Sequence, residues 1–182
     1  MGLLKSKVPK EYRYHNYHHT EYIIEKVFEI GKEEGCNEDE LRLLSLAALW
    51  HDVGYINTYT GHEEEGCKMV RKYFPAFGVE GPDIEKVCGM IMATRVPQQP
   101  HNKLEEIIAD ADLEYLGTSN AEKLAQNLYD ELKFRYPDLS FDEWIRTQVS
   151  FIGNHHYFTT YCIQYREPLK QRYLAELMEK AA

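Results

Sequence analysis

At 182 residues, the chain has the length of one domain and can bury a hydrophobic core without cross-links. Hydrophobic residues make up 43% of it and charged residues 28%, a globular balance that excludes a disordered protein. The 21 basic and 30 acidic residues leave a net charge of −9, which argues against a nucleic-acid polymer or an anionic membrane as partner.

From the N-terminus onward, hydrophobic residues recur at helical spacing. The stripe over 23–30 predicts a helix that stops near Gly35. Asn37 and Glu40 form the pattern of a capping box, which predicts the start of a second helix. That helix covers about 41–50 and is the most apolar segment of the chain.

The middle of the chain continues in the same way. Gly61 lies in a loop that precedes a helix over about 62–73. Pro82 fits the first turn of the next helix, and two prolines enclose a loop over 97–100. A further helical segment covers about 104–117 and ends on a glycine.

Two more capping boxes are predicted in the C-terminal third, Ser119 with Glu122 and Ser140 with Glu143. Each opens a helix with a hydrophobic stripe. A last helix covers about 159–180, with a kink or break at its proline.

No segment alternates with a period of two, so the sequence predicts an all-α fold. We expect one domain over 1–182, a helical bundle of seven to nine helices around one core. A homo-oligomer of such a bundle is compatible with the composition.

The four cysteines show no C-x-x-C spacing, which predicts free thiols in a reducing compartment. No apolar run approaches the roughly 18 residues that a membrane span needs. The N-terminus also lacks the apolar core of a signal peptide. We therefore expect a cytoplasmic protein.

The candidate chemistry lies in histidines and acids near the ends of apolar helices. His15 and His19 are four residues apart, so they could share one helical face. His51 and Asp52 directly follow the most apolar helix, and Asp112 lies in an apolar segment. Buried carboxylates need a cation, and imidazole with carboxylate suits a divalent metal such as Zn, Mn, Fe or Co. Each motif alone also fits a helix cap or a solvated helix end, whereas the ordered set predicts a metal site.

With these motifs in this order, the chain resembles the HD superfamily of metal-dependent phosphohydrolases, and most of all its small stand-alone bacterial members. The resemblance covers about residues 10–120 and leaves helices over about 118–180 to pack on that core. The motifs that carry it are Tyr14-His15-Asn16-x-x-His19, His51-Asp52-x-Gly54, Gly61-His62-Glu63-Glu64 and Asp110-Ala111-Asp112.

The resemblance implies one divalent metal ion, with Mn, Zn, Co, Ni, Fe and Mg all open. The metal ligands that it implies are His19, His51, Asp52 and Asp112. It also implies that His15 donates a proton to the leaving oxygen. Between Asp52 and Asp112 only His62 and His101 are further histidines, which argues against a second metal.

Supporting roles are predicted for residues around these motifs. Glu63 and Glu64 would hydrogen-bond the catalytic water or a ligand imidazole, or else form a solvated first helical turn. His62, Arg95 and Lys103 are candidates for substrate phosphate, although a lysine is more often simply exposed. Asp110 would contact the metal ligands without binding the metal itself.

The function predicted from the resemblance is hydrolysis of a phosphate ester, a nucleotide or a small phosphorylated metabolite, by metal-activated water. Monoesters and diesters both stay open. Two alternatives are a di-iron oxygenase of the same superfamily and a non-catalytic metal-binding signalling module. The metal content separates them, because the oxygenase needs two irons.

Overall fold

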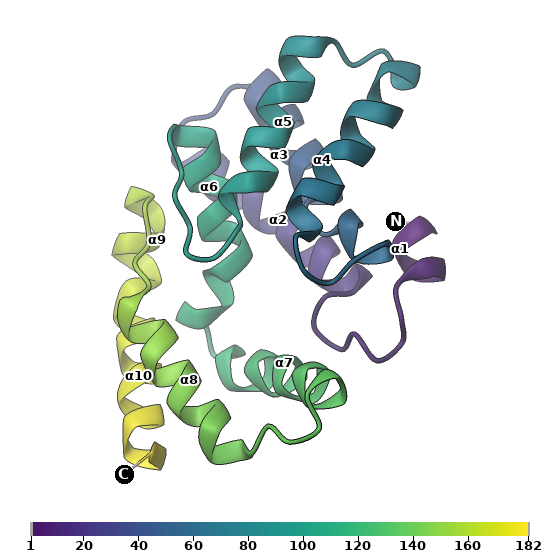
Figure 1. Cartoon of the computed structure of the whole chain (residues 1–182). Helices are drawn as coiled ribbons and strands as arrows, with labels where there is room; N and C mark the ends of the chain where they lie inside the picture. Colours follow the sequence, from purple (N-terminus) through teal and green to yellow (C-terminus); the bar gives the residue numbers. More distant parts are fainter. Residues whose placement is uncertain (1, 182) are drawn as a thin grey trace.

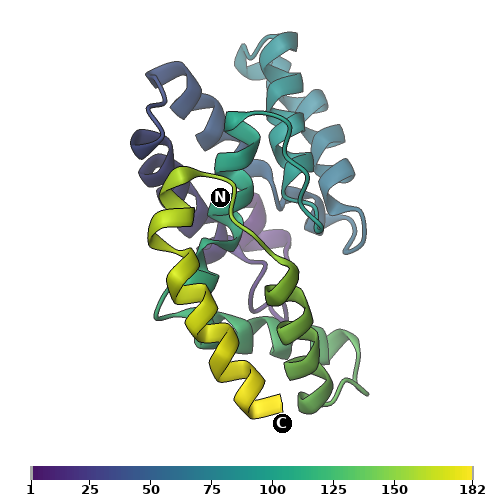
Figure 2. The ribbon, with the colours of Figure 1, turned by 90° about the vertical axis from the view of Figure 1, so that its left-hand side faces the viewer.

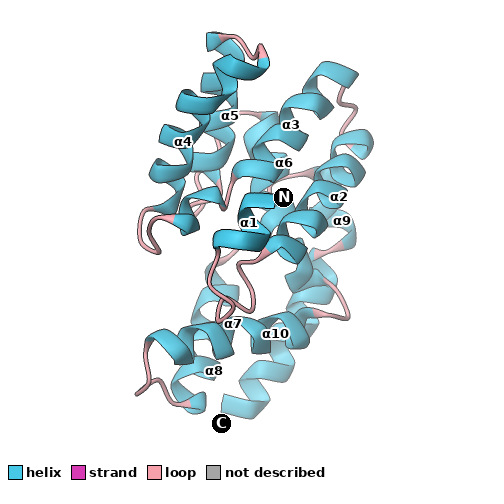
Figure 3. Ribbon diagram, turned by 90° about the vertical axis from the view of Figure 1, so that its right-hand side faces the viewer, coloured by secondary structure: helices cyan, strands magenta, loops and turns pink. Residues whose placement is uncertain are grey.

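The computed structural model describes the backbone of residues 2–181 and the side chains of residues 5–181. That part of the chain forms helices and no strand, which confirms the all-α prediction (Figure 3). The α-helices are α1 (Gly2–Lys7), α2 (Tyr17–Glu33), α3 (Glu38–Trp50), α4 (His62–Tyr73), α5 (Gly81–Ala93), α6 (Lys103–Leu113), α7 (Ala121–Arg135), α8 (Phe141–Asn154), α9 (Thr160–Tyr165) and α10 (Glu167–Ala181). Three short 3-10 helices are η1 (Val53–Ile56), η2 (Phe74–Phe77) and η3 (Glu114–Gly117). The described residues thus hold more α-helices than the seven to nine expected, because α1 is an additional short helix and the predicted last helix is divided into α9 and α10.

A first hydrophobic core lies between α2, α3, α4, α5 and α6, in the upper half of Figure 1. Ile30, Leu44, Ile91 and Ile107 come from four of these helices and are fully buried. The hydrophobic stripes predicted from the sequence therefore face this core. The first turns of α2 and α4 and the C-terminal ends of α3 and α6 carry the polar residues of the candidate site.

A second hydrophobic core lies between η3, α7, α8 and α10, in the lower half of Figure 1. Leu116, Ile152 and Leu177 are among its most buried members. In Figure 2, α10 runs alongside α8 at the front of the molecule. The C-terminal helices therefore build a layer of their own against the end of α6, and the candidate site lies between the two cores.

A buried ionic group joins the two halves. The Glu114 side chain is fully buried and accepts hydrogen bonds from the Tyr22 hydroxyl of α2 and the Arg166 guanidinium. Arg166 also donates to Glu29 at 3.1 Å. A buried carboxylate is tolerated here because it has a cation and a hydroxyl as partners.

Two of the three predicted capping boxes are confirmed, at Asn37 with Glu40 and at Ser140 with Glu143. α3 begins at Glu38, slightly before the predicted position 41.

The third predicted capping box, Ser119 with Glu122, is wrong. α7 begins at Ala121, and its N-cap Asn120 makes no side-chain cap. Thr118 instead organises this turn, because its side-chain oxygen accepts the Asn120 N–H at 3.1 Å and its carbonyl accepts the Ala121 N–H.

The predicted last helix is interrupted at Arg166, which separates α9 from α10. Pro168 lies just after the break, in the first turn of α10, where its missing N–H costs no helical hydrogen bond. Gly117 touches the break, since a Cβ at this position would lie 2.4 Å from the Arg166 carbonyl oxygen. The break thus lets η3 and α10 approach closely.

Across residues 2–181, no helix combines the length and the apolar character that a membrane span requires. Cys36, Cys67, Cys88 and Cys162 are free thiols, as predicted.

Candidate metal centre and its cavity

The start of α2 places the first two histidines. Asn16 is the N-cap, and its side-chain oxygen accepts the His18 N–H at 2.9 Å. His19 therefore lies in the first turn of α2, whereas His15 precedes the helix. The prediction that the two share a helical face is wrong, although their ring centroids are 6.1 Å apart and both point inward from this segment.

The second pair of candidate ligands, His51 and Asp52, directly follows the apolar helix α3. His51 follows Trp50 and is 1% exposed, and Asp52 is 5% exposed. His51 Nδ1 lies 2.8 Å from the Ala48 carbonyl oxygen, which can only accept, so Nδ1 carries the proton. This leaves the Nε2 lone pair free for a metal.

Close packing against the start of α4 explains why the His51-Asp52-x-Gly54 motif has a glycine at its last position. A Cβ at Gly54 would lie 1.9 Å from the His62 carbonyl oxygen, so only glycine allows η1 to meet the start of α4. The contact brings His62 Nε2 to 3.6 Å from Asp52 Oδ1. Gly61, at φ 71°, makes the left-handed turn that enters α4.

Asp112 and Asp110 point in different directions, because residues two apart on a helix do not share a face. Asp112 Oδ1 lies 3.0 Å from His19 Nε2. The fully buried Asp110 carboxylate instead accepts the backbone N–H groups of Phe158 and Thr159 and the Thr159 hydroxyl. Its role here is to anchor the segment before α9, in contrast to the predicted support of the ligands.

The four residues predicted as metal ligands come together from α2, the end of α3 and the end of α6. His51 Nε2 lies 3.2 Å from Asp52 Oδ2 and 3.6 Å from Asp112 Oδ1. His19 Nε2 lies 3.7 Å from Asp52 Oδ2. Ligand atoms about 2.1 Å from one ion are about 3 Å apart at neighbouring coordination positions, close to these separations.

Two buried polar atoms point to the same conclusion. His51 Nε2 and Asp52 Oδ2 are buried and have no hydrogen-bond partner. Orphaned buried polar atoms are rare and need an explanation. A divalent cation bound by two imidazoles and two carboxylates supplies it, so the residues present fit a metal. Ligand atoms of His19, His51 and Asp112 all lie within 4.8 Å of one another.

The electrostatics of the centre favour a cation. Burial lowers the pKa of His51, but the Asp52 and Asp112 carboxylates and the Ala48 carbonyl together raise it to about 9. Burial alone would raise the pKa of Asp52, yet His51 and the other imidazoles hold it well below its usual value. A concentration of negative charge that attracts a proton so strongly also attracts a metal ion.

A residue that the sequence did not reveal holds His15. Glu131 of α7 is 1% exposed, and its Oε1 lies 2.6 Å from His15 Nδ1. Its Oε2 accepts the backbone N–H groups of Tyr14 and His15 at 2.9 and 3.0 Å. Burial lowers the pKa of His15, but the hydrogen bond to Glu131 and the nearby carboxylates raise it above the usual value. No local signal marks Glu131, because it is one of many acids on a polar helix.

The predicted phosphate contacts divide into two groups. His62 lies beside the centre, stacked on Tyr55 with ring centroids 3.9 Å apart, and burial lowers its pKa. Arg95 binds the Glu64 carboxylate and lies 3.3 Å from Glu63 Oε2, so its guanidinium is already paired at the edge of the site.

Lys103 and His101 lie away from the centre. Lys103 opens α6 and pairs with Glu40 at 3.4 Å, near the start of α3. Nine residues of helix separate it from Asp112, about 13 Å. The structure therefore does not bring Lys103 or the exposed His101 to the site.

A cavity of about 380 Å³ joins the centre to the C-terminal helices. His15, Asp52, His62, Glu63 and Asp112 line one end of it. The other end lies between α6, α7 and α8.

The fold and this site define an all-α protein with an imidazole–carboxylate centre suited to a divalent metal. A family model of the HD domain matches residues 16–114, more than half of the chain, and the chain therefore belongs to the HD domain family.

One solved structure is described as a predicted HD superfamily hydrolase from an uncultured Thermotogales bacterium. It is similar to this chain at 21% sequence identity, with a TM-score of 0.59, over 91% of this chain and 79% of that chain. At this identity the likeness concerns the fold. A search among curated proteins finds no match.

Proposed function

We propose that this protein is a metal-dependent phosphohydrolase that cleaves a phosphate ester. The observation that carries the proposal is that His15 lines one cavity together with the candidate ligands Asp52 and Asp112, while the other two candidate ligands, His19 and His51, lie directly beside these carboxylates. A proton donor and a cation site that face the same space suit the hydrolysis of a phosphate ester, in which a leaving oxygen needs a proton. A divalent cation held by the ligands His19, His51, Asp52 and Asp112 would supply an activated water and offset phosphate charge.

His15 acts as the general acid in this proposal. Glu131 occupies its Nδ1, so Nε2 on the other side of the ring is the atom that can serve the cavity. The raised pKa keeps a larger share of the imidazole protonated near neutral pH. As water attacks phosphorus and the P–O ester bond breaks, His15 Nε2 donates its proton to the leaving oxygen.

Glu63 and His62 complete the polar end. Glu63 is 7% exposed, and its Oε2 lies 3.6 Å from His62 Nδ1. The carboxylate can accept a hydrogen bond from the attacking water, and the neutral His62 ring can donate one to a phosphate oxygen. Arg95 keeps the Glu63 carboxylate in place.

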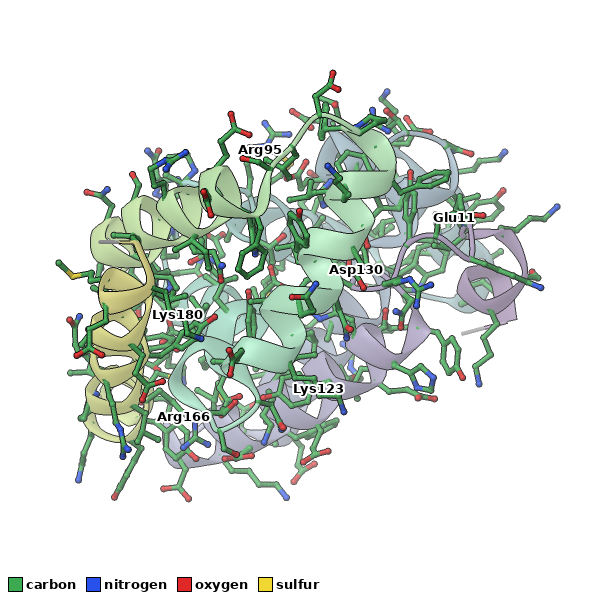
Figure 4. All side chains as sticks on the ribbon, turned by 90° about the horizontal axis from the view of Figure 1, so that it is seen from below. Glu11, Arg95, Lys123, Asp130, Arg166 and Lys180 are labelled. Carbon is green, nitrogen blue, oxygen red and sulfur yellow. The ribbon has the colours of Figure 1, made fainter. Side chains whose placement is uncertain are left out.

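The test is a panel of phosphomonoesters, phosphodiesters and nucleotides, with Mn, Co or Mg added, read by release of phosphate or alcohol. We expect metal-dependent turnover of at least one class, and its loss in Asp52→Asn. Asp130→Asn is the control, since it removes one exposed carboxylate of α7 (Figure 4). One bound metal per chain without turnover of any ester would favour a binding module, and two bound irons would favour the oxygenase.

A further inference from the structure

The cavity has an apolar end beyond the metal centre. The side chains that form it come from α6, η3, α7 and α8 and are Leu113, Leu116, Leu128, Trp144, Phe151 and Ile152. These side chains offer no hydrogen bonds to compensate a buried charge, and the polar residues beside them, Tyr115, Thr147 and Gln148, are uncharged. The part of a substrate that lies here must therefore be uncharged and largely apolar.

The charge of the cavity limits the phosphate to a single group. Among the described side chains that line it, none belongs to lysine or arginine, while Asp52, Glu63 and Asp112 are acidic. Arg95, which contacts Glu63, is paired with two carboxylates. A polyphosphate chain requires several cationic partners, whereas one phosphoryl group can be served by the metal and His15.

One buried amide breaks the apolar surface. Gln148 of α8 is 5% exposed and lines the cavity. Its Oε1 accepts the hydroxyl of Tyr173, a residue of α10 that is 8% exposed, at 3.0 Å. With the oxygen occupied, the NH₂ group is what Gln148 offers to the cavity. A ligand with an acceptor at this point can pair with this donor, whereas a ligand without one leaves the donor unpaired once it displaces water, so the first kind is favoured.

Building on the phosphohydrolase function proposed above, we infer that the substrate is a monophosphate ester of an uncharged ring compound whose ring accepts a hydrogen bond from Gln148 Nε2. The ring lies in the apolar end, where Trp144 and Phe151 provide flat surfaces. Tyr173 is a positioning residue, because its hydroxyl holds the amide oxygen and so directs the NH₂ group toward the ring.

The first test compares two aryl phosphates of similar size, 4-methylumbelliferyl phosphate, which has a ring carbonyl, and 1-naphthyl phosphate, which has no acceptor beyond the ester. We expect Gln148→Leu to lower the ratio of kcat/KM between the carbonyl and the naphthyl ester about 3- to 10-fold, as for one lost hydrogen bond. Tyr173→Phe should lower it in the same direction, because the amide is then free to turn. Gln126→Leu, an exposed glutamine of α7, is the control for the ratio. An unchanged ratio in both variants would overturn the role of Gln148.

The second test addresses the phosphate and the apolar end. We expect AMP to be hydrolysed at least about tenfold more efficiently than ATP or glycerol 3-phosphate, because neither a polyphosphate nor a small polar alcohol suits the cavity. Equal or better turnover of ATP or glycerol 3-phosphate would overturn the substrate class while leaving the hydrolase function intact.

Binding of the alcohol product separates this inference from the hydrolase function. 4-Methylumbelliferone, which has no phosphate, should bind and quench Trp144 fluorescence in a Trp50→Phe background. Gln148→Leu should weaken the binding about 3- to 10-fold. No turnover of any ester together with such binding refutes the hydrolase and keeps the apolar subsite. Absence of binding, or equal binding to the variant, refutes the subsite.

Discussion

The contact between Glu131 and His15 allows a quantitative test. Glu131→Gln keeps the shape of the side chain but removes its charge. The remaining oxygen can still accept the backbone N–H groups of Tyr14 and His15, which Oε2 accepts in the wild type. The new NH₂ group then faces His15 Nδ1, so this nitrogen must accept and can no longer carry a proton. The substitution therefore disfavours the imidazolium form of His15.

The size of the effect follows from the lost interaction. A hydrogen bond between charged partners is worth about 1.5 to 3 kcal/mol, which corresponds to roughly one to two pKa units. Burial lowers the pKa of His15, and without the Glu131 charge fewer interactions remain to offset this lowering. On the alkaline side of the wild-type limb each unit reduces the protonated fraction tenfold, so we expect kcat/KM for an alkyl phosphate to fall about 10- to 100-fold there and less at lower pH. The stability should fall by about 1 to 2 kcal/mol.

The assay is the pH profile of kcat/KM from pH 5.5 to 9, with metal content and thermal unfolding measured on the same samples. The limb at high pH, where His15 loses its proton, should move to lower pH by the same one to two units, as this estimate from hydrogen-bond strength requires. Asp130→Asn removes a negative charge from the neighbouring, exposed position of α7 and should leave the limb in place (Figure 4). A folded, metal-loaded Glu131→Gln protein with an unmoved limb would refute the positioning role and make Glu131 a purely structural residue.

Three further outcomes are expected. Asp52→Asn should weaken metal binding by at least about 100-fold in calorimetric titration while the helical circular dichroism persists, and unchanged affinity would exclude Asp52 as a ligand. His15→Asn should keep the metal and lower kcat/KM about 10²- to 10⁴-fold for an alkyl ester, with a smaller loss for p-nitrophenyl phosphate; equal losses would leave His15 a binding residue. Burial and the Lys170 ammonium lower the pKa of His155 to about 4, so the unfolded chain binds a proton more readily than the folded one below about pH 6.5. This contribution to stability is complete above about pH 6.5 and is lost as the pH falls toward 4, so urea unfolding should show about 1 to 2 kcal/mol lost between pH 7 and 5 that is absent in His155→Asn.

Much of the fold could be predicted because its signals are local. The capping box at Asn37 and Glu40 joins residues three positions apart, and the hydrophobic stripes repeat within a few turns. The failure at Ser119 has the same origin, since Thr118 one position earlier organises the turn and competes for the same donors. Where two local patterns overlap, packing around the turn decides between them.

The sequence by itself determined the helical class. Its short motifs, which follow a fixed order along the chain, also predicted His19, His51, Asp52 and Asp112 as metal ligands, and the structure brings these four side chains together. Within Asp110-Ala111-Asp112 the prediction placed Asp112 at the centre, where it lies beside His19, but it did not show that Asp110 turns away to hold the segment before α9, because that contact depends on which element packs against the other face of the helix.

Only the tertiary structure decided what surrounds the four candidate ligands. Glu131 meets His15 across 116 positions of sequence, and Tyr173 reaches Gln148 from a different helix. The same applies to Lys103, which the fold carries to the far end of α6. Such contacts depend on how whole helices pack, and a single acid, amide or lysine on a polar helix carries no local pattern that distinguishes a buried partner from a solvated one.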